Sequence, residues 1–121
     1  DIKKGHQTKE FNEFINSSIL KKINITKIYT CFCLETNPGC ECYKPSPGMI
    51  LNAIKEYNIE IKSSYFVGDT WRDVGLCKNT NMTSILMDRG FYGNMKNDFL
   101  QRNLTPDHII NSFAELKNII K

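Results

Sequence analysis

The chain has 121 residues, of which 40% are hydrophobic and 24% are charged, and its formal net charge is +3. This length and composition predict one globular domain and exclude a disordered chain. The small, dispersed charge does not indicate a nucleic-acid partner. Because there is no apolar run long enough to span a bilayer, we expect no membrane partner and assign a cytoplasmic location by default.

The first predicted elements are a helix and a strand. Thr8 is a plausible N-cap, and Phe11 and Phe14 fall at helical spacing on an apolar face that we expect to pack against a sheet. Residues Ile25–Thr30 are rich in β-branched and aromatic side chains, which favours a strand. That strand would deliver the next segment to the carboxyl end of the sheet, where open α/β folds bind ligands.

Four of the five cysteines follow this predicted strand as two Cys-x-Cys pairs. Pro38 and Gly39 lie between the pairs and allow the chain to reverse. Four thiolates brought together by a turn can complete a tetrahedral zinc site, so we predict a zinc loop over residues 31–42 with the ligands Cys31, Cys33, Cys40 and Cys42. Two disulfides or free buried thiols are the alternatives.

A second predicted helix follows the cysteines. Ser46 is a suitable N-cap, and Pro47 suits the first helical position. Lys44 lies just before this start, where its ammonium group and the helix N-terminus could both attract a phosphate. The alternative for Lys44 alone is a surface lysine.

The next strand and turn predict a magnesium site. Val67 and Gly68 end a short apolar run and are followed by Asp69 and, four residues later, by Asp73. Carboxylates at the carboxyl edge of a sheet suit a hard cation such as Mg²⁺. The alternatives are a helix-capping role for Asp69 and an orienting role for Asp73.

The remaining elements complete an alternating pattern. We predict a helix that contains Cys77 as a core thiol, followed by a strand at 82–87. The loop at 88–99 could form a substrate-side flap. A short strand at 106–110 and a closing helix over 113–120 complete the chain. Such alternation predicts an α/β, Rossmann-like parallel sheet with helices on both faces.

Two segments together carry a family resemblance: Lys44-Pro45-x-Pro47-Gly48-Met49 and Val67-Gly68-Asp69-x-x-x-Asp73. With the cysteine loop ahead of them, the chain resembles the haloacid dehalogenase superfamily of phosphatases. It is most similar to the zinc-containing branch of D-glycero-D-manno-heptose 1,7-bisphosphate and histidinol-phosphate phosphatases. The resemblance covers nearly the whole chain and implies a magnesium-dependent phosphomonoester hydrolase acting on a sugar phosphate.

The resemblance also implies roles for single residues. Lys44 matches the catalytic lysine that neutralises the nucleophile and the bound phosphoryl group. Asp69 matches the main Mg²⁺ ligand, Asp73 the second acidic position, and the four cysteines of residues 31–42 the structural zinc ligands. Tyr43 and Thr70 are expected at the substrate, although the family tends to have arginine and lysine there, which casts doubt on a bisphosphate substrate.

The sequence also departs from the family pattern because it contains neither an Asp-x-Asp strand nor a Thr/Ser-Asn-Gln segment. The first aspartate of Asp-x-Asp is the family nucleophile, and residues 1–5 resemble the loop after the second motif. We therefore expect residues 1–121 to be a single partial domain whose N-terminal part is missing and could act as its partner. We expect this chain alone to be inactive. The alternatives are a noncatalytic zinc-containing domain that binds a ligand or protein, and a structural zinc module.

Overall fold

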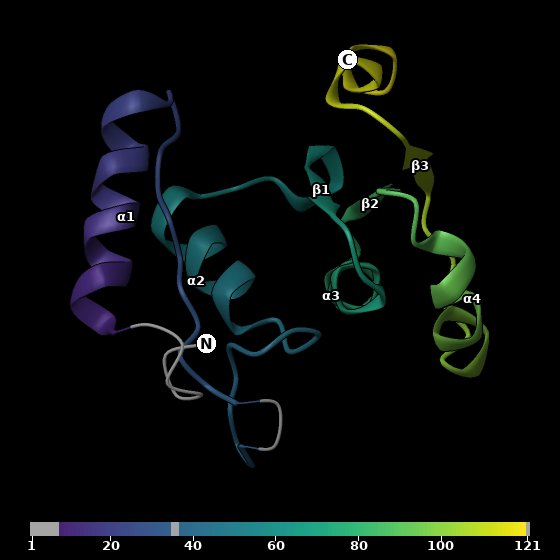
Figure 1. The fold of residues 1–121 in the computed structure, drawn as a ribbon, viewed down its shortest axis with the longest axis horizontal. Coiled ribbons are helices and arrows are strands. Elements are labelled where there is room, and N and C mark those ends of the chain that lie inside the picture. Colours follow the sequence, from purple (N-terminus) through teal and green to yellow (C-terminus); the bar gives the residue numbers. More distant parts are fainter. Residues whose placement is uncertain (1–7, 35–36, 121) are drawn as a thin grey trace.

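The sheet consists of three short parallel strands, β1 (Tyr65–Gly68), β2 (Thr83–Met87) and β3 (His108–Ile110). They lie in the order β1-β2-β3, and the register pairs Val67 with Ile85 and Ile85 with His108. The computed structural model describes residues 8–34 and 37–120 (Figure 1). The predicted α/β class with a parallel sheet is confirmed.

Helical segments cover both faces of this sheet. Helices α3 (Trp71–Thr80) and α4 (Tyr92–Gln101) form the crossovers, and Leu86 of β2 packs with Val74 and Phe99 from them. The other face packs against η2 (Phe113–Asn118), a 3₁₀ helix, through a cluster of Ile85, Met87, Ile110, Leu116 and Ile119. Because strand side chains alternate between faces, adjacent residues of β2 contribute to both layers.

The N-terminal elements lie on the opposite side of the molecule from β3 and α4 (Figure 1). They are α1 (Lys9–Lys22) and α2 (Gly48–Tyr57), followed by the short 3₁₀ helix η1 (Ile61–Ser63). The hydroxyl of Thr8 caps α1 by accepting the Phe11 amide at 3.1 Å, as expected from the sequence.

The predicted packing of α1 against the sheet is wrong. Helix α1 has no buried residue, and Phe11 and Phe14 are 53% and 66% exposed. The apolar face predicted from the periodicity exists, but none of the described strands lies against it.

The predicted strand at 25–30 is also wrong, because these residues form no strand. They are held by side chains instead: Asn16 of α1 donates to the Thr30 hydroxyl at 3.0 Å, and Tyr29 donates to Glu56 of α2. β-branched residues favour extended backbone, but a strand also needs a ladder partner, and none of the described strands pairs with this segment.

One of the two remaining predictions needs correction. The expected flap at 88–99 is largely α4, because Tyr92, Met95 and Phe99 recur at helical spacing and pack on Val74. The expected closing helix is present as the 3₁₀ helix η2, which a Ser112–Glu115 capping box initiates.

The start of α2 differs as well. The helix begins at Gly48, and Ser46 does not cap it, because Pro47 is the N-cap residue and has no side-chain capping bond. The amide of Gly48 instead donates to the carbonyl of Glu41 at 2.8 Å, and a Cβ at Gly48 would collide with that carbonyl. The cysteine loop is thus fixed to the first turn of α2.

Candidate functional site

The candidate site is built at the carboxyl end of β1. The strand ends at Gly68, and Asp69 and Thr70 connect it to α3. The side chain of Asp69 is 52% exposed, and its nearest ionic partner, Arg89, lies at 3.8 Å just after β2. Two parallel strands therefore present a carboxylate and a guanidinium group at one edge of the sheet, as the topology of such sheets requires.

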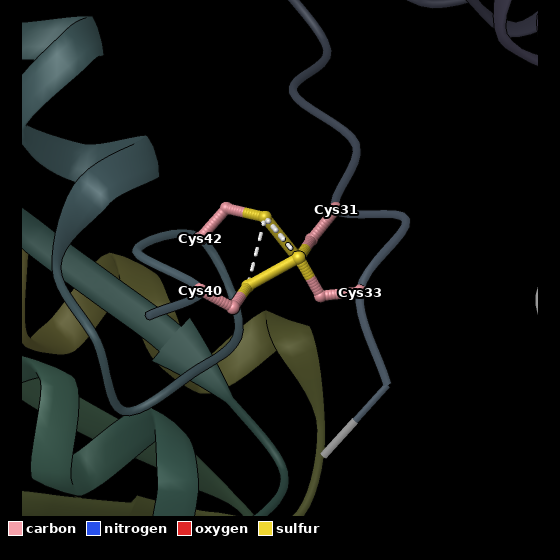
Figure 2. Close-up of side chains that lie close together, drawn as sticks. All are labelled: Cys31, Cys33, Cys40 and Cys42. Carbon is pink, nitrogen blue, oxygen red and sulfur yellow. Dashed lines mark hydrogen bonds between the residues drawn. A yellow bond between two sulfur atoms is a disulfide. The ribbon is translucent and has the colours of Figure 1, made fainter. Parts of the chain in front are cut away.

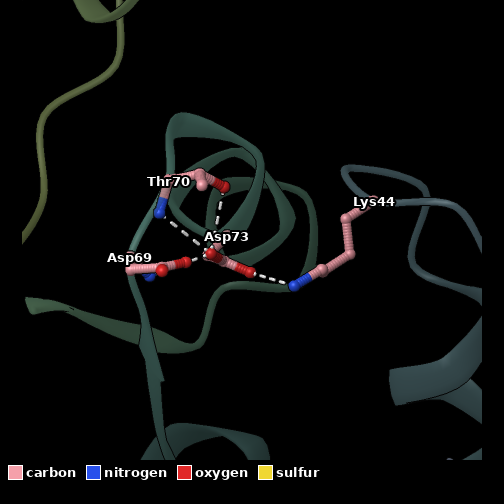
Figure 3. Close-up of polar contacts among 4 residues, drawn as sticks. All are labelled: Lys44, Asp69, Thr70 and Asp73. Atoms are coloured by element: carbon pink, nitrogen blue, oxygen red, sulfur yellow. Dashed lines mark hydrogen bonds and ion pairs between the residues drawn. The ribbon is translucent and has the colours of Figure 1, made fainter. Parts of the chain in front are cut away.

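Asp73 organises the turn from within α3. Its side chain is only 3% exposed, and Oδ2 accepts the amides of Asp69 and Thr70, each at 3.0 Å, and the Thr70 hydroxyl at 3.1 Å (Figure 3). Oδ1 accepts from the Lys44 ammonium group. The prediction that Asp73 ligates Mg²⁺ stays a prediction, and in this geometry its carboxylate orients Lys44 and the Asp69 turn.

Gly68 is required at this place because of crowding. A Cβ at Gly68 would collide with the side chain of Asp73. The absence of a side chain at Gly68 lets Asp73 approach the strand.

Lys44 joins the cysteine loop to the sheet edge. Its ammonium group reaches Asp73 across 29 residues of sequence and lies 6.0 Å from the centroid of the Phe66 ring (Figure 3). With a side chain that is 37% exposed, Lys44 keeps access to the solvent side of the site. A positive charge held there by a buried carboxylate is available to an anionic ligand.

A cavity of about 380 Å³ contains these groups. Its lining combines the apolar side chains of Phe66, Met87 and Phe113 with four charged residues, Lys44, Asp69, Asp73 and Arg89. A site with two cations and an accessible carboxylate can bind an anionic oxygen ligand together with a hard cation. Asp69 fits that cation because its carboxylate is exposed and does not take part in the hydrogen bonds that occupy Asp73.

Tyr43 and Thr70 lie next to these groups in different ways. The Thr70 hydroxyl donates to Asp73, so Thr70 supports the turn directly. The ring of Tyr43 lies 5.8 Å from the guanidinium carbon of Arg72 and borders a neighbouring cavity of about 220 Å³, which Lys44 also lines. The predicted substrate contacts of Tyr43 and Thr70 stay predictions.

The four predicted zinc ligands form a single cluster. The sulfur atoms of Cys31, Cys33, Cys40 and Cys42 all lie within 4.8 Å of one another (Figure 2). The structure joins them as the disulfides Cys31–Cys42 and Cys33–Cys40, one of the alternatives that the sequence leaves open. The Cys40–Cys42 and Cys33–Cys42 sulfur separations are both 3.6 Å. A zinc tetrahedron with bonds of about 2.3 Å has edges of about 3.8 Å, so the donor set fits zinc as well.

Sequence reasoning missed Arg89. The signal was present, because Arg89 follows the predicted strand at 82–87 by two residues and must therefore lie at the same edge as Asp69. Cys77, in contrast, is the core thiol that was expected: it is 3% exposed, and burial raises the pKa of its thiol to about 12.

Comparison with known proteins identifies the family. A family model described as HAD-hydrolase-like, where HAD stands for haloacid dehalogenase, matches residues 41–116. The chain belongs to this family. The match begins inside the cysteine loop, and Lys44, Asp69 and Asp73 lie within the matched residues.

Curated relatives are bacterial sugar-phosphate phosphatases. The chain is 37% identical over 94 residues to D-glycero-alpha-D-manno-heptose-1,7-bisphosphate 7-phosphatase of Campylobacter jejuni, a match that covers 77% of this chain and 51% of that protein. It is 33% identical over 118 residues to D-glycero-beta-D-manno-heptose-1,7-bisphosphate 7-phosphatase of Pasteurella multocida, covering 93% of this chain and 62% of that protein. The chain thus spans about half to three fifths of the length of these relatives.

The described helices give no indication of a membrane span. Among residues 8–34 and 37–120, none of the helices is both long enough and apolar enough to cross a bilayer.

Proposed function

We propose that this chain forms part of a magnesium-dependent phosphatase that acts on a sugar phosphate. The observation that carries the proposal is the contact between Lys44 and buried Asp73 beside the exposed carboxylate of Asp69, within one cavity at the carboxyl edge of the sheet. The family match and the names of the relatives support the same reaction class.

Each residue has a separate task in this proposal. Lys44 places a positive charge at the phosphoryl oxygens, where charge develops as the bond to phosphorus breaks. Asp73 holds the lysine and the turn in position. Asp69 binds Mg²⁺, which supplies Lewis-acid stabilisation of the phosphoryl group.

The nucleophile of the proposed reaction lies outside these 121 residues. Family chemistry passes through an aspartyl phosphate, formed by the first aspartate of an Asp-x-Asp segment, and this sequence contains no such segment. Catalysis by this route therefore needs an aspartate from another segment or another chain.

The proposed substrate is a phosphorylated sugar such as heptose 1,7-bisphosphate. The relatives' names support that sugar, while Tyr43 and Thr70 weaken the case for a second phosphate because neither carries a positive charge. Arg89 adds a cation to the cavity that the family resemblance did not predict, and it lies 3.8 Å from Asp69.

We propose zinc binding by the cysteine cluster as the second part of the function. Four sulfur donors within 4.8 Å of one another support it. The cluster also connects to the site through the chain itself, because Lys44 follows Cys42 by two residues and the Tyr43 amide donates to the Cys40 sulfur at 3.3 Å. Zinc would hold the loop that presents Lys44.

The second candidate function is a noncatalytic, zinc-containing domain that binds a phosphorylated ligand or a protein. The lack of an Asp-x-Asp segment in this sequence favours it. The two candidates differ in turnover, since both would bind an anion at Lys44.

The test is phosphate release from a panel of sugar mono- and bisphosphates by the intact natural protein, with and without Mg²⁺. We expect magnesium-dependent turnover that falls about 100-fold or more in Lys44→Ala, because removal of one group that stabilises developing charge typically costs that much. Lys55→Ala, on the exposed side of α2, is the matched control and should keep full activity. Phosphate or sugar-phosphate binding without turnover would overturn the enzyme proposal in favour of the binding domain.

A further inference from the structure

The cysteine cluster has two arms that can be joined in more than one way. Cys31 and Cys33 come from the first arm, and Cys40 and Cys42 come from the second (Figure 2). Both disulfides of the structure cross between the arms: Cys31–Cys42 with a Cα separation of 5.5 Å, and Cys33–Cys40 with 6.5 Å. These separations lie within the ordinary range for disulfides, so the backbone is already shaped for cross-arm bonds.

The same backbone also suits a four-sulfur metal site. The sulfur pairs that are not bonded to each other include Cys31–Cys40 at 4.0 Å and Cys40–Cys42 at 3.6 Å, close to the edge of about 3.8 Å of a zinc tetrahedron. Changing between the two states requires each bonded pair of sulfur atoms to separate, while the arms can stay in place.

We propose that the cluster is a redox-sensitive zinc site. A peroxide would convert the zinc-bound thiolates into the disulfides Cys31–Cys42 and Cys33–Cys40, and zinc would be released. This inference rests on the zinc binding proposed above and goes beyond a purely structural metal.

The chemistry balances with a peroxide as the oxidant. In each cross-arm pair, one thiolate attacks a peroxide oxygen, the O–O bond breaks, and a sulfenic acid and hydroxide form. The second thiolate of the pair then attacks the sulfenic sulfur, which forms the S–S bond and expels a second hydroxide. Each disulfide reduces one hydrogen peroxide and, with two protons, yields two waters. The four thiolates thus lose four electrons to two peroxides, and Zn²⁺ leaves unreduced.

The position of the cluster gives the reaction a consequence for the site. Either crosslink holds the arms together, and the second arm leads within two residues to Lys44, which contacts Asp73. We expect the oxidised, zinc-free loop to keep Lys44 near Asp73, whereas the reduced, zinc-free loop keeps only its hydrogen bonds, such as that from the Gly48 amide to the Glu41 carbonyl, and holds Lys44 less firmly. Oxidation would therefore remove the metal while the site stays assembled.

Cys77 provides an internal control. It lies in the core of α3, is 3% exposed, and is the one free cysteine of the described residues. A buried neutral thiol reacts poorly with peroxide, so Cys77 should remain reduced while the cluster is oxidised.

The experiment uses the reduced, intact protein with its measured zinc content. Hydrogen peroxide is added, zinc release is followed with a chromogenic chelator, and disulfides are mapped by mass spectrometry after digestion with chymotrypsin and a glutamate-specific protease. The sequence makes the map unambiguous, because Phe32 separates Cys31 from Cys33, Glu35 separates Cys33 from Cys40, and Glu41 separates Cys40 from Cys42.

We expect release of about one zinc per chain together with the cross-arm pairs Cys31–Cys42 and Cys33–Cys40, and recovery of zinc binding after reduction by dithiothreitol. Thermal melts should show the oxidised form close in stability to the zinc form and both above the reduced, zinc-free form.

Each contrary outcome has a distinct meaning. A reduced protein that binds no added zinc would overturn both the zinc site and this inference. A protein that binds zinc but keeps it under peroxide, or that forms within-arm pairs or sulfonic acids, would overturn the redox proposal alone and leave the proposed zinc site and phosphatase standing.

Discussion

Gly68 and Asp73 are so close that the position before Asp69 tolerates no side chain. We predict that Gly68→Ala destabilises the protein by about 1–3 kcal/mol, because a Cβ there would collide with the Asp73 side chain and overpack the turn. Gly93→Ala is the control: apart from its chain neighbours and the backbone of its own helix, no atom lies within 4 Å of the position of its Cβ, and alanine is the better helix former. Urea unfolding of both variants measures the difference, and equal stabilities would contradict the crowding argument.

The thiol of Cys77 reports on how tightly the core around α3 is closed. Burial raises the pKa of its thiol to about 12, so the thiolate fraction in the folded protein is far below that of an exposed cysteine at pH 8. We predict that iodoacetamide alkylates Cys77 at least about 100-fold more slowly in the folded than in the urea-unfolded protein. Comparable rates would show that the α3 core opens readily.

The same shift has a defined pH dependence. Because the folded pKa of this acid is raised, the unfolded chain loses the thiol proton at a lower pH than the folded chain does. The contribution of Cys77 to stability is therefore constant below the unfolded pKa, about 8.5, and decreases as the pH rises above it.

Residues defined by a local motif were the most predictable. Lys44, Asp69 and the four clustered cysteines could be located because each follows directly from residue type and short spacing, and the structure brings the first two into one cavity. The contact between Lys44 and Asp73 was less predictable, since it spans 29 residues and depends on how α2 and α3 are placed.

At the scale of elements, the cysteine loop and α2 form one connected unit. The Gly48 amide donates to the carbonyl of Glu41, and the Tyr43 amide donates to the sulfur of Cys40. These bonds lie on both sides of Lys44, so the cysteine cluster helps to fix the position of the Lys44 backbone. A change in the cysteine cluster should therefore alter the position of Lys44 although no residue of the cavity is replaced.

We predict that Cys40→Ser lowers zinc binding at least about 10-fold, since one thiolate ligand is lost, and weakens phosphate binding at Lys44 through the loosened loop. Glu41→Gln, in the same loop with all four sulfur atoms kept, is the matched control. Elemental analysis and a phosphate titration measure the two effects. Full zinc and phosphate binding in Cys40→Ser would show that the cysteine cluster does not support the binding site at Lys44.

Elements were predictable where one local pattern dominated. Helix α1 was predicted from its cap and its apolar spacing, but the partner of its apolar face depends on tertiary structure that periodicity does not contain. Helix α4 was missed because Gly93 and two asparagines are poor helix formers, whereas packing of Tyr92 and Phe99, whose ring centroids lie 5.5 Å apart, decides the outcome. The segment 25–30 shows the converse, since strand propensity without a pairing partner gave no strand.

At the scale of the whole fold, the proposed phosphoryl site lies in a sequence of 121 residues that contains no Asp-x-Asp segment. We predict that the 121-residue chain alone releases no phosphate from sugar phosphates at enzyme-like rates, with or without Mg²⁺. A protein that carries these residues together with an Asp-x-Asp segment, assayed in parallel, is the control. Magnesium-dependent turnover by the isolated chain would show that another residue supplies the nucleophile.

Binding of Mg²⁺ by Asp69 is the property on which the proposed phosphatase site depends most, and a calorimetric Mg²⁺ titration of the intact protein measures it. Asp69→Asn keeps the shape of the side chain but removes the negative charge that a hard cation requires, whereas Asp98→Asn removes an exposed carboxylate of α4 that pairs with Arg102. We predict an Mg²⁺ affinity at least about 10-fold lower in Asp69→Asn and unchanged in Asp98→Asn, with both variants folded by thermal melt. Wild-type Mg²⁺ affinity in a folded Asp69→Asn protein would contradict it.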